Sequence, residues 1–131
     1  VDMIAEAHKL DMLTCPYVFD EEQAAAMTKA GADIIVAHMG LTTGGTIGAE
    51  TARTLEDCVG IITGIVKVVK DINPEALVIC HGGPIAEPKD AAYIIENVPG
   101  IDGFFGATSI ERFAAERGIK AQTEAFKSIK K

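Results

Sequence analysis

Two histidines stand at corresponding places in the sequence. His38 ends the apolar run from Asp33 to His38, and His81 directly follows the apolar run from Ala76 to Cys80. A neutral imidazole can move a proton near pH 7, so a histidine at the end of a strand is a candidate general acid or base. A structural histidine is the plainer interpretation of either residue alone. The equivalent position of both favours a shared site.

Loops rich in glycine or hydroxyl residues follow three predicted strands. The candidate residues for binding a substrate or phosphate are Thr43, Gly44, Gly45 and Thr46 in the first loop, Gly82 and Gly83 in the second, and Gly106, Ala107, Thr108 and Ser109 in the third. Amides and hydroxyls without bulky side chains can cradle an oxyanion, and the first loop could also close as a lid. A flexible surface loop and close backbone packing are the plainer interpretations of the first two.

Glu111 is a third candidate catalytic residue. Its spacing from Thr108 also matches a capping box, in which its carboxylate would only accept a bond from a backbone amide. The following residue, Arg112, could pair with an anion or remain solvated. The cysteines Cys15, Cys58 and Cys80 lack metal-ligand spacing, and we expect them to be buried, reduced thiols of a cytoplasmic protein. The sequence therefore predicts no metal site.

Short β-branched runs alternate with longer helical periods. The predicted strands are Met12 to Cys15, Asp33 to His38, Ala76 to Cys80 and Ile101 to Phe105. The predicted helices are residues 1–10, Asp20 to Ala30 and Thr54 to Asp71, and Asp20 with Gln23 forms a capping box at the start of the second. A fourth predicted helix has Pro88 in its first turn and Ile94 and Ile95 facing inward. A last predicted helix has Ile119, Phe126 and Ile129 on one side.

Strands that alternate with helices predict a parallel sheet, closed either as a doubly wound sheet or as a barrel. A (β/α)₈ barrel needs eight units and roughly 250 residues. We therefore predict an α/β fold of the (β/α)₈ TIM-barrel type. In this prediction, residues 1–131 form a single domain that supplies about four C-terminal units of the barrel, and we interpret the chain as a fragment. The active-site residues of a barrel lie at the C-terminal ends of its strands. Cys15, Tyr17 and the two histidines are therefore better candidates for the active site than Asp33 and Asp102, which begin strands.

Charge and the length of the apolar runs argue against two classes of partner. The chain has 19 acidic and 12 basic side chains, a formal charge of −7 and no basic cluster beyond Lys130 and Lys131. A nucleic-acid partner is disfavoured, because phosphate backbones require clustered cations. The apolar runs are far shorter than the roughly 20 residues that span a bilayer, so we expect a soluble protein without a membrane partner. Because half a barrel exposes two open strand edges, we expect a homo-oligomer or completion by further sequence.

Three segments carry a family resemblance. Residues 31–50 (GADIIVAHMGLTTGGTIGAE), 80–92 (CHGGPIAEPKDAA) and 100–112 (GIDGFFGATSIER) resemble the phosphoenolpyruvate hydrolase-like family, also called TIM-barrel signal transduction proteins. The resemblance implies the later half of a (β/α)₈ barrel and a small phosphorylated carboxylate as ligand. It implies an enzyme, or alternatively a ligand-sensing barrel without turnover. No cofactor is expected within this chain, and a divalent metal held by the missing half is left open.

Overall fold

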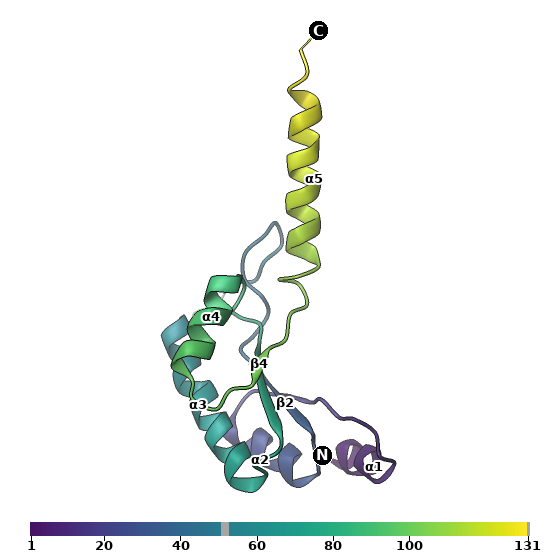
Figure 1. The fold of residues 1–131 in the computed structure, drawn as a ribbon, viewed down its shortest axis with the longest axis vertical. Helices are drawn as coiled ribbons and strands as arrows, with labels where there is room; N and C mark the ends of the chain where they lie inside the picture. Colours follow the sequence, from purple (N-terminus) through teal and green to yellow (C-terminus); the bar gives the residue numbers. More distant parts are fainter. Residues whose placement is uncertain (51–52, 131) are drawn as a thin grey trace.

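The computed structural model describes residues 1–50 and 53–130, in which helices and strands alternate along the chain (Figure 1). In chain order the elements are α1 (Asp2–Lys9), β1 (Tyr17–Val18), α2 (Glu21–Lys29), β2 (Ile34–His38), α3 (Leu55–Ile72), β3 (Leu77–His81), α4 (Pro88–Asn97), β4 (Gly103–Phe104) and α5 (Arg112–Lys127). No helix in this part of the chain combines the length and apolar character that a membrane crossing requires.

The strands form one parallel sheet in the order β1-β2-β3-β4. Strand order therefore follows chain order, without the reversal that a doubly wound sheet has at its switch point. The longest pairing joins β2 and β3 over five residues, from Ile34 opposite Leu77 to His38 opposite His81. The predicted α/β fold with a parallel sheet is confirmed.

A layer of helices covers one face of the sheet (Figure 1). In this layer α2 contacts α3, and α3 contacts α4. The long helix α3 buries Cys58, Ile62, Ile65, Val66 and Val69 against the sheet. Burying one such aliphatic side chain contributes about 1.5–3 kcal/mol, so this stripe is a main source of the stability of the fold.

Local signals place the helix ends. The side chain of Thr54 accepts a hydrogen bond from the Asp57 amide at 3.1 Å, and Asp57 accepts one from the Thr54 amide at 2.8 Å, a complete capping box before α3. At α2, Asp20 accepts from the Gln23 amide at 2.8 Å as predicted. The Gln23 side chain, however, accepts from Phe19, one residue earlier than a standard box requires.

The first predicted strand was placed wrongly. Its regular part is Tyr17–Val18 rather than Met12 to Cys15. Pro16 does not end the pairing, because its carbonyl accepts from the Val36 amide at 3.0 Å and no proline N–H is needed on this side. Two further expectations were also wrong: Ile95 is 47% exposed while Ile94 is buried, and Cys15 is exposed. Cys58 and Cys80 are buried, which raises the pKa of each thiol to about 11.

Two aspartates stabilise the edge of the sheet where the strands begin. The carboxylate of Asp33 accepts hydrogen bonds from the amide and the hydroxyl of Thr14, both at 2.8 Å, and these bonds lower its pKa. Asp102 accepts from the Val78 amide at 2.7 Å and from the Lys70 ammonium at 3.0 Å. Each carboxylate thereby ties a strand start to a neighbouring segment, which agrees with the structural role predicted for this edge.

Helix α5 extends away from the sheet and the other helices (Figure 1). Phe113 in its first turn is buried, whereas residues 117–130 are all exposed. The predicted apolar side chains Ile119, Phe126 and Ile129 are 65–72% exposed. Within the described chain this helix therefore covers no face of the sheet.

Candidate active site

The two predicted histidines lie side by side where β2 and β3 end. Successive side chains of a strand point to opposite faces, and Ala37 and Cys80 pack into the core beneath the helices. The next residues, His38 and His81, therefore point to the other face. They are register partners, and their ring centroids are 5.0 Å apart.

Three aromatic rings complete a histidine–aromatic cluster, consisting of Tyr17, Phe19, His38, His81 and Phe105. The ring of Tyr17 lies 4.9 Å from that of His38 and 5.3 Å from that of His81, and it is nearly parallel to the latter. Phe19 lies 5.0 Å from His38, and Phe105 lies 5.5 Å from His81. The rings form an apolar wall around two groups that can move protons.

Tyr17 was a predicted site residue, whereas the two phenylalanines of the cluster were not. Phe19 stands two residues after Tyr17, which in an extended chain places both side chains on one face. Phe105 directly precedes the glycine that opens the last loop. Strand periodicity, extended one residue beyond the observed strands β1 and β4, is the signal that would have found both.

The hydrogen bond of His38 assigns its tautomer. The Gly40 amide donates to Nδ1 of His38 at 3.0 Å, so this nitrogen carries a lone pair and the neutral ring carries its hydrogen on Nε2. Burial and, to a lesser extent, the neighbouring His81 lower the pKa of His38. At neutral pH His38 is therefore an uncharged hydrogen-bond donor through Nε2.

His81 has the opposite tautomer. Its Nδ1 lies 2.6 Å from the Phe105 carbonyl oxygen, which can only accept, so Nδ1 must carry the hydrogen. The neutral ring then has its lone pair on Nε2, where it can accept a proton. The side chain is well packed, since His81 is only 8% exposed. The backbone thus makes one imidazole a donor and the other a base.

The second glycine loop is held by close backbone packing. The Gly83 amide donates to the Gly40 carbonyl at 2.7 Å, and the Gly83 carbonyl accepts from the Thr43 amide at 3.0 Å. Gly82 has a φ of +74°, and a Cβ there would lie 2.3 Å from the Gly40 oxygen. The plainer interpretation of these glycines is confirmed. The amide of Gly83 is occupied, while that of Gly82 has no acceptor among the described residues.

The first glycine loop rests on α5. Glu116 accepts hydrogen bonds from the amide and the hydroxyl of Thr46 at 3.2 and 2.8 Å, and Arg112 donates to the Gly44 carbonyl at 3.2 Å. A Cβ on Gly45 would collide with Arg112, so the loop and the helix are in close contact. In this arrangement Thr46 has no free donor for a ligand. We call the bonds that join Gly44 and Thr46 of this loop to Arg112 and Glu116 of α5 the loop latch.

The third loop offers free backbone amides. The Ala107 carbonyl accepts from the amides of Ile110 and Glu111, both at 2.9 Å, which closes a helical turn just before α5. The amides of residues 106–109, in the turn's N-terminal part, have no acceptor within the described chain. Such amides are typical of anion sites. They directly follow Phe105, whose carbonyl contacts His81.

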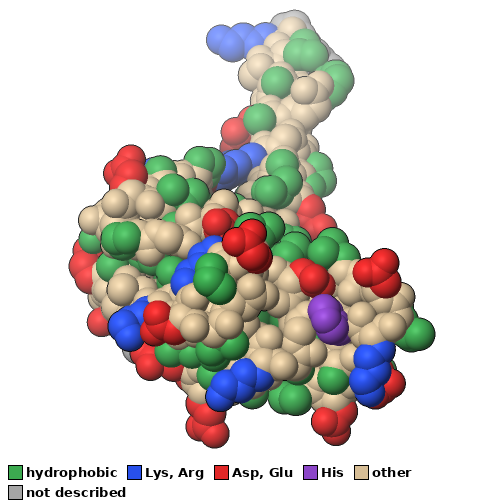
Figure 2. Space-filling model, turned by 60° about the horizontal axis from the view of Figure 1, so that its bottom comes forward, with side chains coloured by type: hydrophobic (Ala, Val, Ile, Leu, Met, Phe, Trp, Pro, Cys, Tyr) green, Lys and Arg blue, Asp and Glu red, His purple; other side chains and the backbone are tan. Residues whose placement is uncertain are grey.

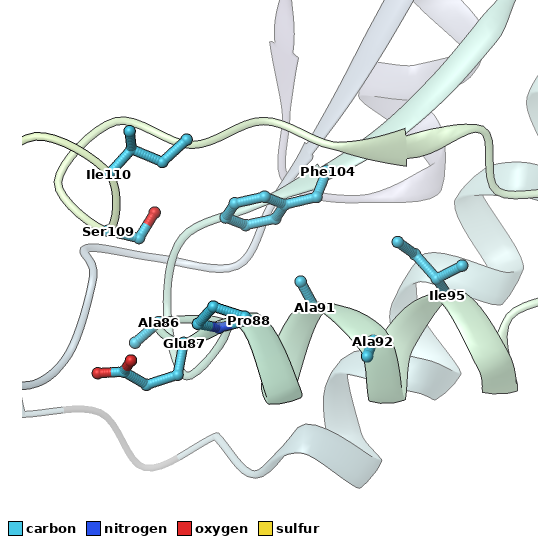
Figure 3. A pocket seen from close by; sticks show the side chains of 9 residues that line it. All are labelled: Ala86, Glu87, Pro88, Ala91, Ala92, Ile95, Phe104, Ser109 and Ile110. Atoms are coloured by element: carbon cyan, nitrogen blue, oxygen red, sulfur yellow. The ribbon is translucent and has the colours of Figure 1, made fainter.

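The capping box predicted for this loop does not form. In a capping box the Glu111 amide would donate to the Thr108 side chain, whereas here it donates to the Ala107 carbonyl at 2.9 Å. Glu111 stands directly before α5, and no hydrogen bond in the described chain links it to either histidine of the cluster. The Ser109 side chain lines a groove beside α4 rather than the cluster (Figure 3).

Among residues 1–50 and 53–130, no three side chains of His, Cys, Asp or Glu are grouped so that they could hold a metal ion. The chemistry that these residues can perform is proton transfer and hydrogen bonding by the two imidazoles, together with anion binding by the amides.

Comparison with known proteins gives a consistent family match. The family described as "Phosphoenolpyruvate hydrolase-like" matches residues 1–129. The chain is 52% identical over 129 residues to the ToMV susceptible protein tm-1(GCR26) and 51% identical to the ToMV resistance protein Tm-1(GCR237), both of Solanum lycopersicum. It is 32% identical to the putative transcriptional regulatory protein y4pA of Sinorhizobium fredii.

These alignments cover 98% of this chain but only 17% of each tomato protein and 21% of the bacterial one. The chain therefore spans about a fifth or less of these curated relatives. Among solved structures, nitroalkane oxidase from Streptomyces ansochromogenes superposes with a TM-score of 0.49 at 25% identity, over 82% of this chain and 30% of that chain.

Proposed function

Because the chain belongs to the phosphoenolpyruvate hydrolase-like family, we propose that it forms the catalytic half of an enzyme that hydrolyses a small phosphorylated carboxylate of the phosphoenolpyruvate type. The observation that carries the proposal is the pair of opposite tautomers at His38 and His81, next to a turn of free amides. A donor and a base side by side are the minimum that assisted hydrolysis needs.

We also propose that the chain is the C-terminal half of a (β/α)₈ barrel. Two features support this: the parallel strands follow one another in chain order, and one face of the sheet carries the helix layer. The histidine–aromatic cluster lies on the other face, where the strands end, which is where barrel enzymes place their active sites. Further sequence would then cover the open edge of β1.

In the proposed complex, the phosphate lies on the amides of residues 106–109 and on the free amide of Gly82. Backbone N–H groups at the start of a helical turn stabilise negative charge without side-chain movement. In this proposal Glu111 has no catalytic role. The first glycine loop forms a wall, held in place by the loop latch.

The proposed reaction begins with attack of a water molecule on phosphorus while Nε2 of His81 takes a proton from the water. The new P–O bond forms as the bond from phosphorus to the enolate oxygen breaks. The proton on His81 then passes to the enolate, and pyruvate and phosphate leave. His38 remains neutral throughout and donates a hydrogen bond from Nε2 to the oxygen on which charge develops, because its lowered pKa disfavours the charged ring.

The test is pyruvate release from phosphoenolpyruvate by the full-length protein and by its His81→Gln and His38→Gln variants. We expect His81→Gln to lower kcat by about 10²-fold or more, which is the usual contribution of a general base. His8→Gln is the matched control, since His8 lies exposed on α1, and it should release pyruvate at the unsubstituted rate. Undiminished release by His81→Gln would remove this residue from the mechanism.

A ligand-sensing domain without turnover is the second candidate. The names of the relatives favour it, since they describe a virus susceptibility or resistance protein and a transcriptional regulator. Calorimetry with phosphoenolpyruvate separates the two functions. A sensor binds the ligand but releases no pyruvate, and its His81→Gln variant loses only affinity.

A further inference from the structure

Helix α5 contacts the rest of the molecule through its charged side. Arg112 and Glu116 form the loop latch, and Arg117 pairs with Glu87 at the start of α4. Phe113 is buried beneath the same side of the helix and lies under both arginine side chains. These contacts fix the first two turns of α5 and direct the remainder away from the body (Figure 1).

The opposite side of α5 is apolar and has no partner in the described chain. It carries the apolar residues Ala115, Ile119, Phe126 and, just beyond the helix, Ile129, with the polar Gln122 among them. The spacing of four, three, four and three residues is that of a helix contact stripe. Ile119 and Phe126 are 69% and 65% exposed. A 16-residue helix is marginal in water without such packing, so this stripe needs a partner surface.

A matching apolar groove lies between α4 and β4. Figure 3 shows a row of α4 side chains on one side of it and Phe104 and Ile110 on the other. The α4 row is Pro88, Ala91, Ala92 and Ile95, and the groove has a volume of about 400 Å³. Small alanines let a second helix approach closely, while Ile95 is 47% exposed and Ile110 64% exposed. The groove therefore fits the apolar face of an amphipathic helix.

We propose that two copies of this chain exchange α5, so that the apolar stripe of each helix lies in the groove between α4 and β4 of the other copy. The chain's own α5 is unsuited to this groove. The loop latch and the pair of Arg117 with Glu87 hold its first turns on their charged side and carry the stripe outward. A reciprocal exchange buries both stripes and both grooves and closes after two copies.

Charge supports a second copy as the occupant. Residues 1–110 contain 16 acidic and six basic side chains, whereas residues 111–131 contain three acidic and six basic ones. A basic arm is thus attracted to the acidic body of another copy, while two bodies without exchanged arms repel each other. Figure 2 shows acidic side chains spread over the body and apolar ones along the projecting arm.

The test is the mass of the protein in solution, measured by light scattering and sedimentation. We expect two chains per particle. Ile119→Gln with Phe126→Gln on the arm, and separately Ile95→Gln in the groove, should raise the dissociation constant, by at least about a hundredfold for the arm pair, because each lost apolar contact is worth roughly a factor of ten. All three side chains are exposed within one copy, so these variants should still fold.

The matched control is Lys120→Gln with Lys127→Gln, which introduces the same residues on the charged side of α5. This control removes two positive charges of the arm but none of its apolar contacts, so its dissociation constant should rise far less than that of the arm pair. A monomeric unsubstituted protein, or unchanged association in both the arm and the groove variants, would overturn the proposal.

A disulfide test distinguishes exchange from folding back. In a Cys15→Ser background, protein with Ile95→Cys is mixed with protein that carries Ile119→Cys or Phe126→Cys, and the mixture is oxidised. Exchange predicts covalent dimers that contain one chain of each kind. When both cysteines are placed in one chain, a predominantly internal cross-link in a monomer would contradict exchange.

Discussion

Replacement of Gly82 by alanine tests whether backbone packing in the second loop organises the site. Gly82 has a φ of +74°, and its new Cβ would lie 2.3 Å from the Gly40 carbonyl oxygen. The left-handed conformation costs a non-glycine residue about 1–2 kcal/mol. Displacement of Gly40 also weakens its 2.7 Å hydrogen bond from the Gly83 amide, a loss of about 1 kcal/mol.

We therefore expect Gly82→Ala to lower the free energy of unfolding by about 2–3 kcal/mol. The displacement would also move the Gly40 amide, which donates to Nδ1 of His38. The hydrogen bond that orients the His38 ring should weaken, and the rate of the proposed hydrolysis should fall with it.

The assay is urea unfolding followed by circular dichroism, with Gly60→Ala as matched control. Gly60 lies within α3, and a Cβ there meets nothing within 4 Å. The control should therefore stabilise the protein by about 0.5–1 kcal/mol, since alanine is favoured over glycine in a helix. If Gly82→Ala left the midpoint of unfolding unchanged, the packing argument for this loop would be refuted.

Three further predictions concern pH and the loop latch. The lowered pKa of His38 means that the unfolded chain binds a proton more readily than the folded one, so stability should fall as pH decreases below about 6.5. His38→Gln should remove this component from a series of urea titrations, and an unaltered pH dependence would contradict it. The lowered pKa of Asp33 means that its bonds to Thr14 stabilise the fold above about pH 4 and are lost as pH falls through the folded-state pKa. Asp33→Asn should destabilise the protein at pH 7 and reduce its sensitivity to acid; equal stability of both proteins at pH 7 would exclude this role. Glu116→Ala should speed hydrogen exchange at the Thr46 amide, whereas Glu124→Ala, farther along α5, should not; equal rates would show that the latch does not hold the loop.

Local signals in the sequence were sufficient for much of the fold. Thr54 with Asp57 marks the start of α3 through paired hydrogen bonds that depend only on neighbouring residues. The histidine pair was also predictable, because parallel strands of equal phase bring residues at their ends together. His38 and His81 are indeed register partners.

Features that depend on long-range packing were not predictable. Glu111 has capping-box spacing, but the preceding residues already form a helical turn, and the Glu111 amide donates to the Ala107 carbonyl instead of the Thr108 side chain. Thr46 lies in a loop whose composition suits ligand binding, yet its amide and hydroxyl donate to Glu116, 70 residues later in the chain. The helical pattern of apolar residues predicted that Ile95 faces the core. Whether its side of α4 is covered, however, depends on where α5 lies.

The proposed mechanism depends most directly on the opposite tautomers of His38 and His81. Long-range proton–nitrogen NMR spectra of the ¹⁵N-histidine protein distinguish hydrogen on Nδ1 from hydrogen on Nε2, with His8→Gln, His38→Gln and His81→Gln to assign the signals. At pH 8 we predict hydrogen on Nε2 of His38 and on Nδ1 of His81. The same tautomer in both rings, or hydrogen on Nδ1 of His38, would contradict the proposed division into donor and base.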